Sequence, residues 1–514
     1  MTTTEIRVDR ATTSRPAPQP SQHPWLWLCL GTALLPFTTF QDVIPLAAWL
    51  APIFLLRFVR VTRARVGIPV VAVAGYLGTV VAMRDVFPGS GQLLWALPGL
   101  AAGLVYGVDK MTGRHLPPLL RTLAFPAADT ALAFLAGMDR SSAFGTWGAS
   151  GYTQAGSEPL IQMTSVFGIW GLGFLIMWTA SVVNEVWEEG FQLKSRARLV
   201  AGWGALVCTV LAFGGVQLAF FSPDSQAVTV AALAPDLDLD LERDERPDLT
   251  LANRQAVTDG YLEPVIADLF DRTRTAADSG AKIVAWAEAA AYVLEEDEQA
   301  FLERASRVAA EEQIYLETGI ILILSPDADP SNENRSLLWG PDGEMLWDYE
   351  KSTEVLGDGN RPGPGLVPFA DTPYGRLAGI ICFDADFPAL VRQAGRGGAD
   401  ILLVPSSDWD TIAEVHNDMA VFRAVENGAS IVRPTRRGIS SAVDFQGRTL
   451  AVDPDPFTGD NATLLADVPT EGRTTPYAAL FGDVVAWASV LTVLTLCVAA
   501  VVWKVRSRRI GRTM

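Results

Sequence analysis

Long apolar runs alternate with short polar gaps over the first 221 residues, and one more apolar run follows residue 476. Each run holds about 20 residues, the length that an α-helix needs to cross a bilayer. The runs cover residues 24–41, 43–60, 67–84, 91–109, 116–137, 160–183, 198–221 and 478–503. The pattern predicts a polytopic α-helical membrane domain of about eight spans, with seven spans at 24–221 and a C-terminal transmembrane helix at 477–504.

Residues 222–476 show the mixed periods of a soluble domain. Short β-rich runs alternate with helical stretches, which is typical of α/β layers with buried sheets. Strands are predicted at 227–233, 282–287, 314–324, 335–339, 344–350, 376–383, 400–405, 429–434 and 439–445, and helices at 251–279, 295–312, 387–397 and 412–427. Pro341-Asp342-Gly343 predicts a hairpin turn between two of the strands.

The distribution of charge separates the two parts. The chain has 514 residues, is 49% hydrophobic and carries a formal net charge of -18. Residues 222–476 hold 46 acidic and 20 basic residues, a net charge of -26, so the remainder carries +8. An acidic soluble domain is thus joined to a basic membrane domain. This excludes an ordinary soluble enzyme, and we expect no nucleic-acid partner.

Basic residues in the short loops predict the orientation, because Lys and Arg are enriched in short cytoplasmic loops. The basic clusters all fall on the side of the N-terminus. They are Arg57, Arg60, Arg63, Arg65, Lys110, Arg114, Lys194, Arg196, Arg198, Lys504, Arg506, Arg508 and Arg509. We therefore expect a multi-pass plasma-membrane protein with residues 222–476 outside the cytoplasm. A disordered tail (1–23) and a basic tail (505–514) are expected inside it.

Cys382 is the one cysteine of four in the soluble part, since the other three lie in long apolar runs. A cysteine at the end of an apolar strand is more often inert packing than a nucleophile. Two charged residues shift this balance, because Glu288 and Lys351 each close a strand-like run as well. Side chains at strand ends that share one rim of a sheet can meet, although each charge taken alone would be an ordinary surface residue.

These three side chains suffice for acyl transfer through a thioester. The thiol of Cys382 is the nucleophile, the carboxylate of Glu288 takes its proton, and the ammonium of Lys351 stabilises the oxyanion. The backbone N–H of Phe383 would be a second oxyanion donor. The sequence holds no Gly-rich phosphate loop, no cysteine–histidine metal cluster and only three histidines, so we expect neither cofactor nor metal.

The sequences around these residues resemble the nitrilase, or carbon–nitrogen hydrolase, superfamily. They are Ala285-Trp286-Ala287-Glu288, Tyr349-Glu350-Lys351 and Ile381-Cys382-Phe383-Asp384. Further blocks are similar to the apolipoprotein N-acyltransferase family, namely Gly151-Tyr152-Thr153-Gln154, Pro159-Leu160-Ile161-Gln162, residues 168–176 and the region from His416 to Ser440. The resemblance covers nearly the whole chain from residue 24.

The resemblance implies a nitrilase-like αββα sandwich at 222–476 and a reaction in two half-steps. Cys382 would take an acyl chain from a membrane phospholipid, and the α-amino group of the S-diacylglyceryl cysteine of an apolipoprotein would accept it. The implied partners are a phospholipid acyl donor, a diacylated apolipoprotein acceptor and the membrane. Both substrates are anchored in the bilayer, so a catalytic domain held against the outer leaflet gains effective concentration.

Three aromatic residues are candidates for substrate binding. Trp147 and Tyr152 belong to the 139–159 loop, which could form part of the wall of the site near the membrane. Aromatic anchoring at the membrane surface explains them equally well. Trp409 lies near the position of a family tryptophan.

Departures from the family pattern leave alternatives open. Ala287 replaces the proline before the family's catalytic glutamate, and the loop after Lys351 lacks the family's histidine and Pro-Phe-Gly-Glu sequence. Glu354 or Asp358 is the candidate for the carboxylate that supports the lysine, and Asp384 stands in place of a family glutamate. The alternatives are a membrane-tethered amidase or different acyltransferase using the same three residues, or a catalytically inactive paralogue.

Overall fold

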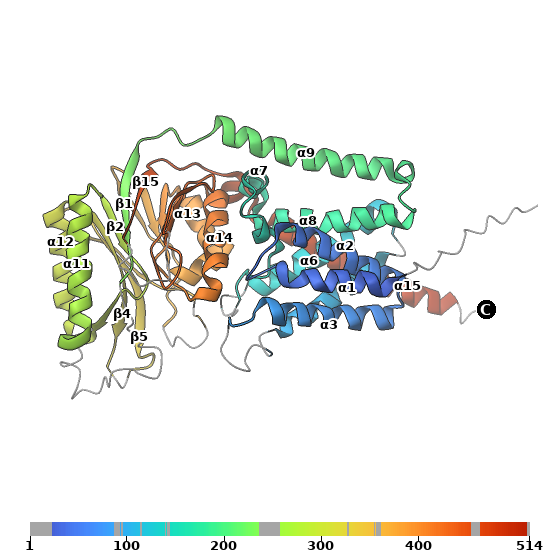
Figure 1. The fold of residues 1–514 in the computed structure, drawn as a ribbon, viewed down its shortest axis with the longest axis horizontal. Coiled ribbons are helices and arrows are strands. Elements are labelled where there is room, and N and C mark those ends of the chain that lie inside the picture. The colour runs from blue at the N-terminus through green and yellow to red at the C-terminus, as the bar shows by residue number, and fades with distance from the viewer. Residues whose placement is uncertain are drawn as a thin grey trace, which may run out of the picture.

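The chain forms a bundle of helices and a layered α/β domain that follow one another along the long axis (Figure 1). The computed structural model describes residues 23–86, 93, 96–113, 116–138, 140, 144–235, 258–325, 328–353, 355, 361–453 and 463–510. The chain enters the layered domain after α9 and returns to the bundle with α15. Residues 1–22 and 511–514, which make up most of the two predicted tails, lie outside the described residues.

The helices of the bundle coincide with the predicted apolar runs. They are α1 (Pro24–Leu34) with the 3₁₀ turn η1 (Leu35–Phe37), α2 (Pro45–Val61), α3 (Ala64–Ala82), the 3₁₀ turn η2 (Leu97–Ala101) with α5 (Ala102–Thr112), α6 (Pro118–Gly137), α8 (Thr164–Glu188), α9 (Ala197–Phe220) and α15 (Val484–Ile510). The last helix continues past the predicted end at residue 504. A short η4 (Ser150–Gln154) and α7 (Glu158–Ile161) lie between α6 and α8.

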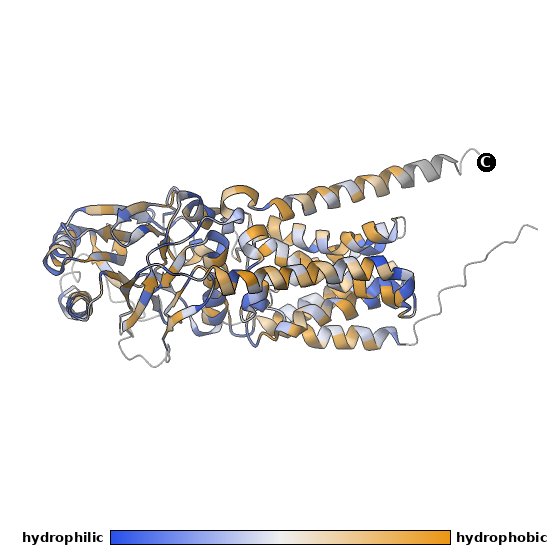
Figure 2. Ribbon diagram, turned by 90° about the horizontal axis from the view of Figure 1, so that it is seen from above, coloured by the Kyte–Doolittle hydropathy of each residue, from blue (hydrophilic) through white to orange (hydrophobic). Residues whose placement is uncertain are grey.

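Five segments of the described chain are long and apolar enough to cross a membrane. They are Ala64–Ala82, Pro118–Gly137, Thr164–Glu188, Leu193–Phe220 and Val484–Val502, and Pro24–Phe37 is a shorter apolar helix. The count of eight spans therefore stays a prediction. Figure 2 shows apolar residues along these helices and polar residues concentrated at the end of the bundle far from the layered domain.

The layered domain contains two large sheets. The first has the strand order β15-β1-β2-β4-β5-β6, with β3 paired to β4, and the second has the order β14-β13-β11-β9-β8-β7. The strands are β1 (Ala227–Leu233), β2 (Ile283–Trp286), β3 (Ala291–Leu294), β4 (Tyr315–Ile323), β5 (Asn332–Trp339), β6 (Met345–Glu350), β7 (Phe369–Thr372), β8 (Gly375–Gly379), β9 (Ile401–Leu403), β10 (Ser406–Ser407), β11 (Ser430–Arg433), β12 (Thr435–Arg436), β13 (Ser441–Val443), β14 (Thr449–Val452) and β15 (Thr463–Pro469).

Helices cover the outer faces of both sheets. The amphipathic helices α11 (Glu263–Asp278) and α12 (Glu298–Glu312) pack their apolar sides on the first sheet. The second sheet is covered by α13 (Pro388–Gly397) and α14 (Asp410–Asn427), which lie between it and the bundle (Figure 1). Apolar side chains of both sheets fill the layer between them. This helix–sheet–sheet–helix order is the one that the resemblance to the nitrilase superfamily implies.

The predicted strands all have counterparts, but three of the four edge strands of the large sheets, β15, β14 and β7, were missed. Strand β15 pairs antiparallel with β1 over seven residues, yet it contains Asp467 and Pro469, which are depleted in strands. The strand predicted at 376–383 ends at Gly379, because a 3₁₀ turn begins at Cys382. The hairpin at Pro341-Asp342-Gly343 is confirmed by the Gly340 N–H bond to the Glu344 carbonyl and by φ of 79° at Gly343.

The sandwich meets the bundle through buried polar contacts of α14. Helix α8 is kinked at Gly168, which has φ of 63°, and the Ile169 N–H beyond the kink donates to Oε1 of Glu426 at 2.6 Å. Arg423 pairs with Oε2 of Glu426 at 2.9 Å, and it also donates to the Tyr152 hydroxyl at 3.1 Å. Glu426 and Arg423 are both fully buried. The Glu426 carboxylate therefore accepts a hydrogen bond from helix α8 of the bundle and also pairs with the Arg423 guanidinium.

Replacing Glu426 by Ala is expected to destabilise the protein by about 3–5 kcal/mol, because it leaves the Arg423 charge and the Ile169 N–H buried without a partner. Thermal unfolding of the detergent-solubilised chain measures the loss, with the exposed Glu303→Ala as the matched control. Equal melting temperatures for the two variants would show that this contact contributes nothing to the docking of the two parts.

Candidate active site

Cys382 stands at a sharp turn between a strand and a helical turn. It follows β8 and begins η8 (Cys382–Asp386), and its φ of 44° lies in the left-handed region. A non-glycine residue held there costs about 1–3 kcal/mol, and such strain is common at functional sites. Ala289, directly after Glu288, also has a positive φ of 51°. The backbone is thus strained at Cys382 itself and at the residue that follows Glu288.

Glu288 and Lys351 form a buried ion pair. Lys351 Nζ lies 2.7 Å from Oε1 of Glu288, and Asn334 Nδ2 donates to the same oxygen at 2.7 Å. The side chains are brought together by three strand ends, since Glu288 follows β2, Lys351 follows β6, and Asn334 lies on β5 between them in space. Only 4% of Glu288 and 3% of Lys351 are exposed.

The thiol of Cys382 lies in the electrostatic field of this pair. Its Sγ is 3.7 Å from the Ser407 carbonyl oxygen, and 6% of the residue is exposed. Burial raises the pKa of the thiol well above its usual value, and the Glu288 carboxylate raises this pKa further, whereas the Lys351 ammonium lowers it. The resting cysteine is a neutral thiol, so forming the thiolate requires a base. We call Glu288, Lys351 and Cys382 the candidate triad.

Asp384 joins the loop after Lys351 to the turn that carries Cys382. Its carboxylate accepts hydrogen bonds from the Tyr349 hydroxyl at 2.8 Å, the Ser352 hydroxyl at 2.9 Å and the Thr353 hydroxyl at 2.6 Å. It also accepts from the backbone N–H of Ile381 at 3.1 Å. Burial raises the pKa of Asp384, while the hydroxyl and N–H donors lower it. Asp384 therefore fixes the position of Lys351 relative to Cys382.

The other predicted residues have varied positions. Glu354 and Asp358 lie outside the described residues. Phe383 has a buried ring, and its N–H belongs to the first turn of η8, where helical N–H groups lack intrahelical acceptors. Its role as an oxyanion donor stays a prediction.

The three candidate substrate-binding aromatics make contacts between the bundle and the sandwich. The indole N–H of Trp147 donates to the Asp386 carboxylate, and that of Trp409 donates to the Val86 carbonyl at 3.0 Å. The hydroxyl of Tyr152 lies 2.8 Å from Oγ1 of Thr146 in the same loop and accepts from Arg423 of α14 at 3.1 Å. Trp147 and Tyr152 are buried, and Trp409 is half-buried.

A group of buried charges beside Cys382 was not predicted. His416 Nδ1 lies 2.9 Å from Oδ1 of Asp408, His416 Nε2 lies 3.3 Å from Oδ2 of Asp386, and Arg433 donates to both oxygens of Asp408. We call Asp386, Asp408, His416 and Arg433 the histidine cluster. Two sequence signals could have drawn attention to it: the chain has only three histidines, and His416 and Arg433 lie in a region that is similar to the family.

Cys382, Asp408 and His416 are the types of residue that bind zinc, and one ligand atom of each lies within 4.8 Å of the others. However, both oxygens of Asp408 already accept from Arg433, and both ring nitrogens of His416 face carboxylates. A divalent cation would also lie beside the Arg433 charge. This donor set therefore does not fit a metal ion.

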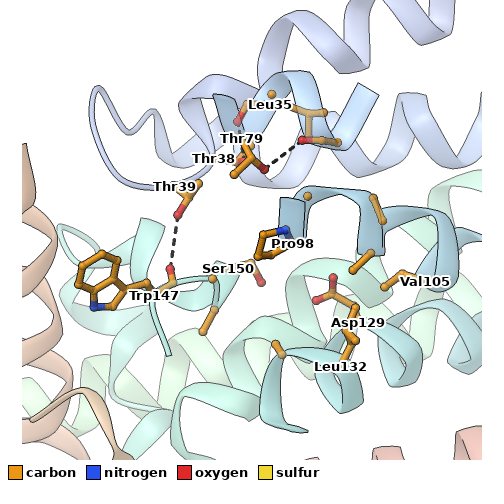
Figure 3. Close-up of a pocket in the computed structure, with 18 of the residues that line it drawn as sticks. Leu35, Thr38, Thr39, Thr79, Pro98, Val105, Asp129, Leu132, Trp147 and Ser150 are labelled. Atoms are coloured by element: carbon orange, nitrogen blue, oxygen red, sulfur yellow. Dashed lines mark hydrogen bonds between the residues drawn. The ribbon is translucent and has the colours of Figure 1, made fainter. Parts of the chain in front are cut away.

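A cavity of about 510 Å³ lies within the bundle, below the 139–159 loop. Its walls are mostly apolar and come from η1, α2, α3, η2, α5 and α6, and Trp147 of the loop also lines it. Figure 3 shows Asp129 and Ser150 at this cavity, which they both line. Among the described residues, no hydrogen-bond or ion-pair partner reaches the Asp129 carboxylate, and the Ser150 hydroxyl is buried without one.

Comparisons with known proteins found similar sequences and structures. The carbon-nitrogen hydrolase family matches residues 250–480. Apolipoprotein N-acyltransferases from Geobacter metallireducens and Shewanella oneidensis are 27% and 26% identical to this chain over 67% and 63% of it, and the matches cover 68% and 63% of those relatives. The crystal structure of an amidase from Nesterenkonia sp. gives a TM-score of 0.38 at 20% identity, covering 48% of this chain and 92% of the amidase.

The sandwich is thus a carbon–nitrogen hydrolase domain, and here it is attached to apolar helices long enough to span a membrane. The similarity to apolipoprotein N-acyltransferases, together with this domain, supports an acyltransferase. The chain spans about two thirds of the length of the two relatives named above.

Two substitutions in the candidate triad are expected to change the reactivity of Cys382 in opposite directions. Glu288→Gln removes the anion that raises the pKa of the thiol, so alkylation of Cys382 by iodoacetamide at neutral pH becomes faster. Lys351→Met removes the cation that lowers this pKa, so alkylation becomes slower. Mass spectrometry of the alkylated protein measures both rates. Equal alkylation rates for the two variants would place Cys382 outside the influence of the pair.

Proposed function

We propose that this protein transfers an acyl chain from a membrane phospholipid to the α-amino group of the S-diacylglyceryl cysteine of apolipoproteins, by way of a thioester on Cys382. The observation that carries the proposal is the buried Glu288–Lys351 ion pair with the strained Cys382 beside it, in a domain attached to membrane helices. The acidic sandwich lies on the extracytoplasmic side, where the acceptor lipoprotein is anchored. Neither a cofactor nor a metal takes part in the proposed reaction.

In the first half-step, Glu288 takes the thiol proton and the Cys382 thiolate attacks an ester carbonyl of the phospholipid. Lys351 and the N–H of Phe383 stabilise the oxyanion of the tetrahedral intermediate. The intermediate collapses by breaking the ester C–O bond, and Glu288 returns the proton to the departing glyceryl oxygen. The products are an acyl thioester and a lysophospholipid.

In the second half-step, the α-amino group of the acceptor attacks the thioester carbonyl and Glu288 takes a proton from it. Collapse forms the amide and expels the Cys382 thiolate, which recovers a proton from Glu288. Water has to be excluded from the thioester, since otherwise the enzyme would be a lipase. The low exposure of all three residues of the candidate triad supports this exclusion.

The bundle cavity favours a lipid over a small amide as the acyl donor. The cavity measures about 510 Å³, and its walls are mostly apolar. A hydrocarbon chain therefore fills such a volume favourably. Trp147 connects the cavity to the sandwich, since its ring lines the cavity and its N–H donates to Asp386.

The two alternatives are less well supported. A membrane-tethered amidase or different acyltransferase could use the same three residues, but a small amide has no use for a large apolar cavity. A catalytically inactive paralogue would not need to keep Lys351 paired with Glu288. Asp384 holds the residues after Lys351 in place, although the sequence of that loop departs from the family pattern.

Replacing Cys382 by Ala is expected to abolish N-acylation of lipoproteins while leaving membrane insertion intact. The measurement is mass spectrometry of lipoprotein N-termini from cells that carry only this variant, with Cys208→Ala, an exposed cysteine of α9, as the control. Trapping of an acylated Cys382 in the wild type after incubation with phospholipid distinguishes the acyltransferase from the inactive paralogue. Unchanged triacylation in the Cys382→Ala cells would refute the proposal.

Filling the cavity is expected to slow transfer from long-chain donors. Ala133→Trp on α6 adds a large side chain to the cavity wall, so thioester formation from a long-chain phospholipid should fall about tenfold or more, while alkylation of Cys382 stays unchanged. Leu135→Trp, at an exposed position of the same helix, is the control and should alter neither rate. Equal rates of thioester formation in the two variants would show that the cavity takes no part in the reaction.

A further inference from the structure

The histidine cluster lies on one side of the Cys382 thiol, apart from the Glu288–Lys351 pair. Its four members come from three separate places in the fold. Asp386 lies on η8, Asp408 lies just before α14 and His416 within it, and Arg433 lies on β11. All four side chains are buried. Such an assembly is costly to bury unless its charges balance, so its state of protonation is constrained by the fold.

The balance of charge assigns a proton to His416. Two carboxylates face two cations only when the imidazole is protonated, because Arg433 supplies just one positive charge. Asp386 and Asp408 raise the pKa of His416 to about 9 against the opposing effect of burial. Arg433 and His416 together lower the pKa of Asp408. His416 therefore keeps its proton below about pH 9 and is an imidazolium at neutral pH.

The described titratable groups that face His416 come from every element packed against it. Asp386 and Cys382 lie on η8, Asp408 precedes α14, and Arg433 lies on β11. The ring of Trp147, at 5.2 Å between centroids, covers the imidazole from the side of the membrane bundle. A ring nitrogen of His416 lies within 4.8 Å of the Cys382 sulfur, close enough for a charge to act strongly in a buried site.

We propose that His416 is a positioning residue of the acyl-transfer site, a cation that acts together with Lys351 and Arg433 to stabilise the Cys382 thiolate whenever it forms, and that Asp386 holds the imidazolium in place. This inference rests on the proposed function, in which a thiolate forms twice, once before it attacks the ester and once when the amine expels it. His416 transfers no proton in either half-step, since Glu288 takes and returns the proton. It acts on Cys382 through its charge.

The membrane bundle takes part in this arrangement through Asp386. The indole N–H of Trp147 donates to Oδ2 of Asp386, and Oγ1 of Thr146 donates to the Asp386 carbonyl at 2.8 Å. Gly145 packs against the same residue, so that a Cβ added to it would lie 2.8 Å from Cβ of Asp386. The 139–159 loop thus holds the Asp386 carboxylate in place, and Asp386 in turn positions the His416 ring. In this way the contact with the bundle controls the charge next to the thiol.

The test compares variants in the full-length protein in detergent, using alkylation of Cys382 by iodoacetamide as a function of pH. His416→Gln should slow alkylation at neutral pH roughly tenfold, the effect of one interaction worth a single pKa unit. Asp386→Asn keeps the imidazole but lowers its pKa. Its alkylation rate relative to wild type should therefore fall as the pH rises from about 6 to about 8.5. Asp410→Asn, at an exposed position on α14, is the control and should match wild type throughout.

Imidazole NMR provides a readout independent of reactivity, because the chain has only three histidines. In a His23→Gln, His115→Gln background, the His416 titration should move to lower pH in Asp386→Asn and in Trp147→Phe. A rate ratio for Asp386→Asn that is constant with pH, or an unmoved His416 titration, would overturn the proposal. Alkylation requires no lipid, so these results are separate from any failure of phospholipid or lipoprotein to react.

Discussion

The ion pair between Glu288 and Lys351 is the interaction on which the site depends. Two opposite charges buried at 2.7 Å between strand ends are stable only when both are present, since either one alone would be an uncompensated charge in a dry interior. The pair fixes the carboxylate where it can receive a proton and fixes the ammonium where it can meet an oxyanion. Asn334 then holds the Glu288 carboxylate by a hydrogen bond, and Asp384 holds Ser352 in the loop after Lys351 in the same way.

The second constraint is the junction between the sandwich and the bundle. Helix α14 supplies Glu426 to the kinked helix α8, while η8 supplies Asp386 to the 139–159 loop. Both elements also support the nucleophile, because η8 begins with Cys382 and α14 carries His416. Docking to the bundle and construction of the site therefore use the same two segments. Under the proposed function both substrates stay in the bilayer, and this shared construction would hold the Cys382 thiol close to them.

The sequence predicted much of the fold because periodicity is a local property. Apolar runs of about 20 residues and short alternating strands are visible without any knowledge of the tertiary contacts. The order Glu288, Lys351, Cys382 was equally accessible, since each residue closes a predicted strand. The missed strands were the edge strands β7, β14 and β15 and the short strands β3, β10 and β12. In β15, Asp467 and Pro469 give little strand signal. The strand before Cys382 was predicted too long, because a 3₁₀ turn with a strained first residue has no sequence signature of its own.

What the sequence determined by itself is the division into apolar helices and an acidic α/β domain, together with the three residue types able to form a thioester. Hydrophobic periodicity and charge composition can be read from the sequence alone, because neither depends on contacts between distant residues. Only the tertiary structure decided that His416 faces two carboxylates, that Trp147 binds Asp386, and that Asp384 binds the two residues after Lys351. Each of these depends on segments far apart in sequence that meet only in the dry interior, where low exposure makes every charge require a partner.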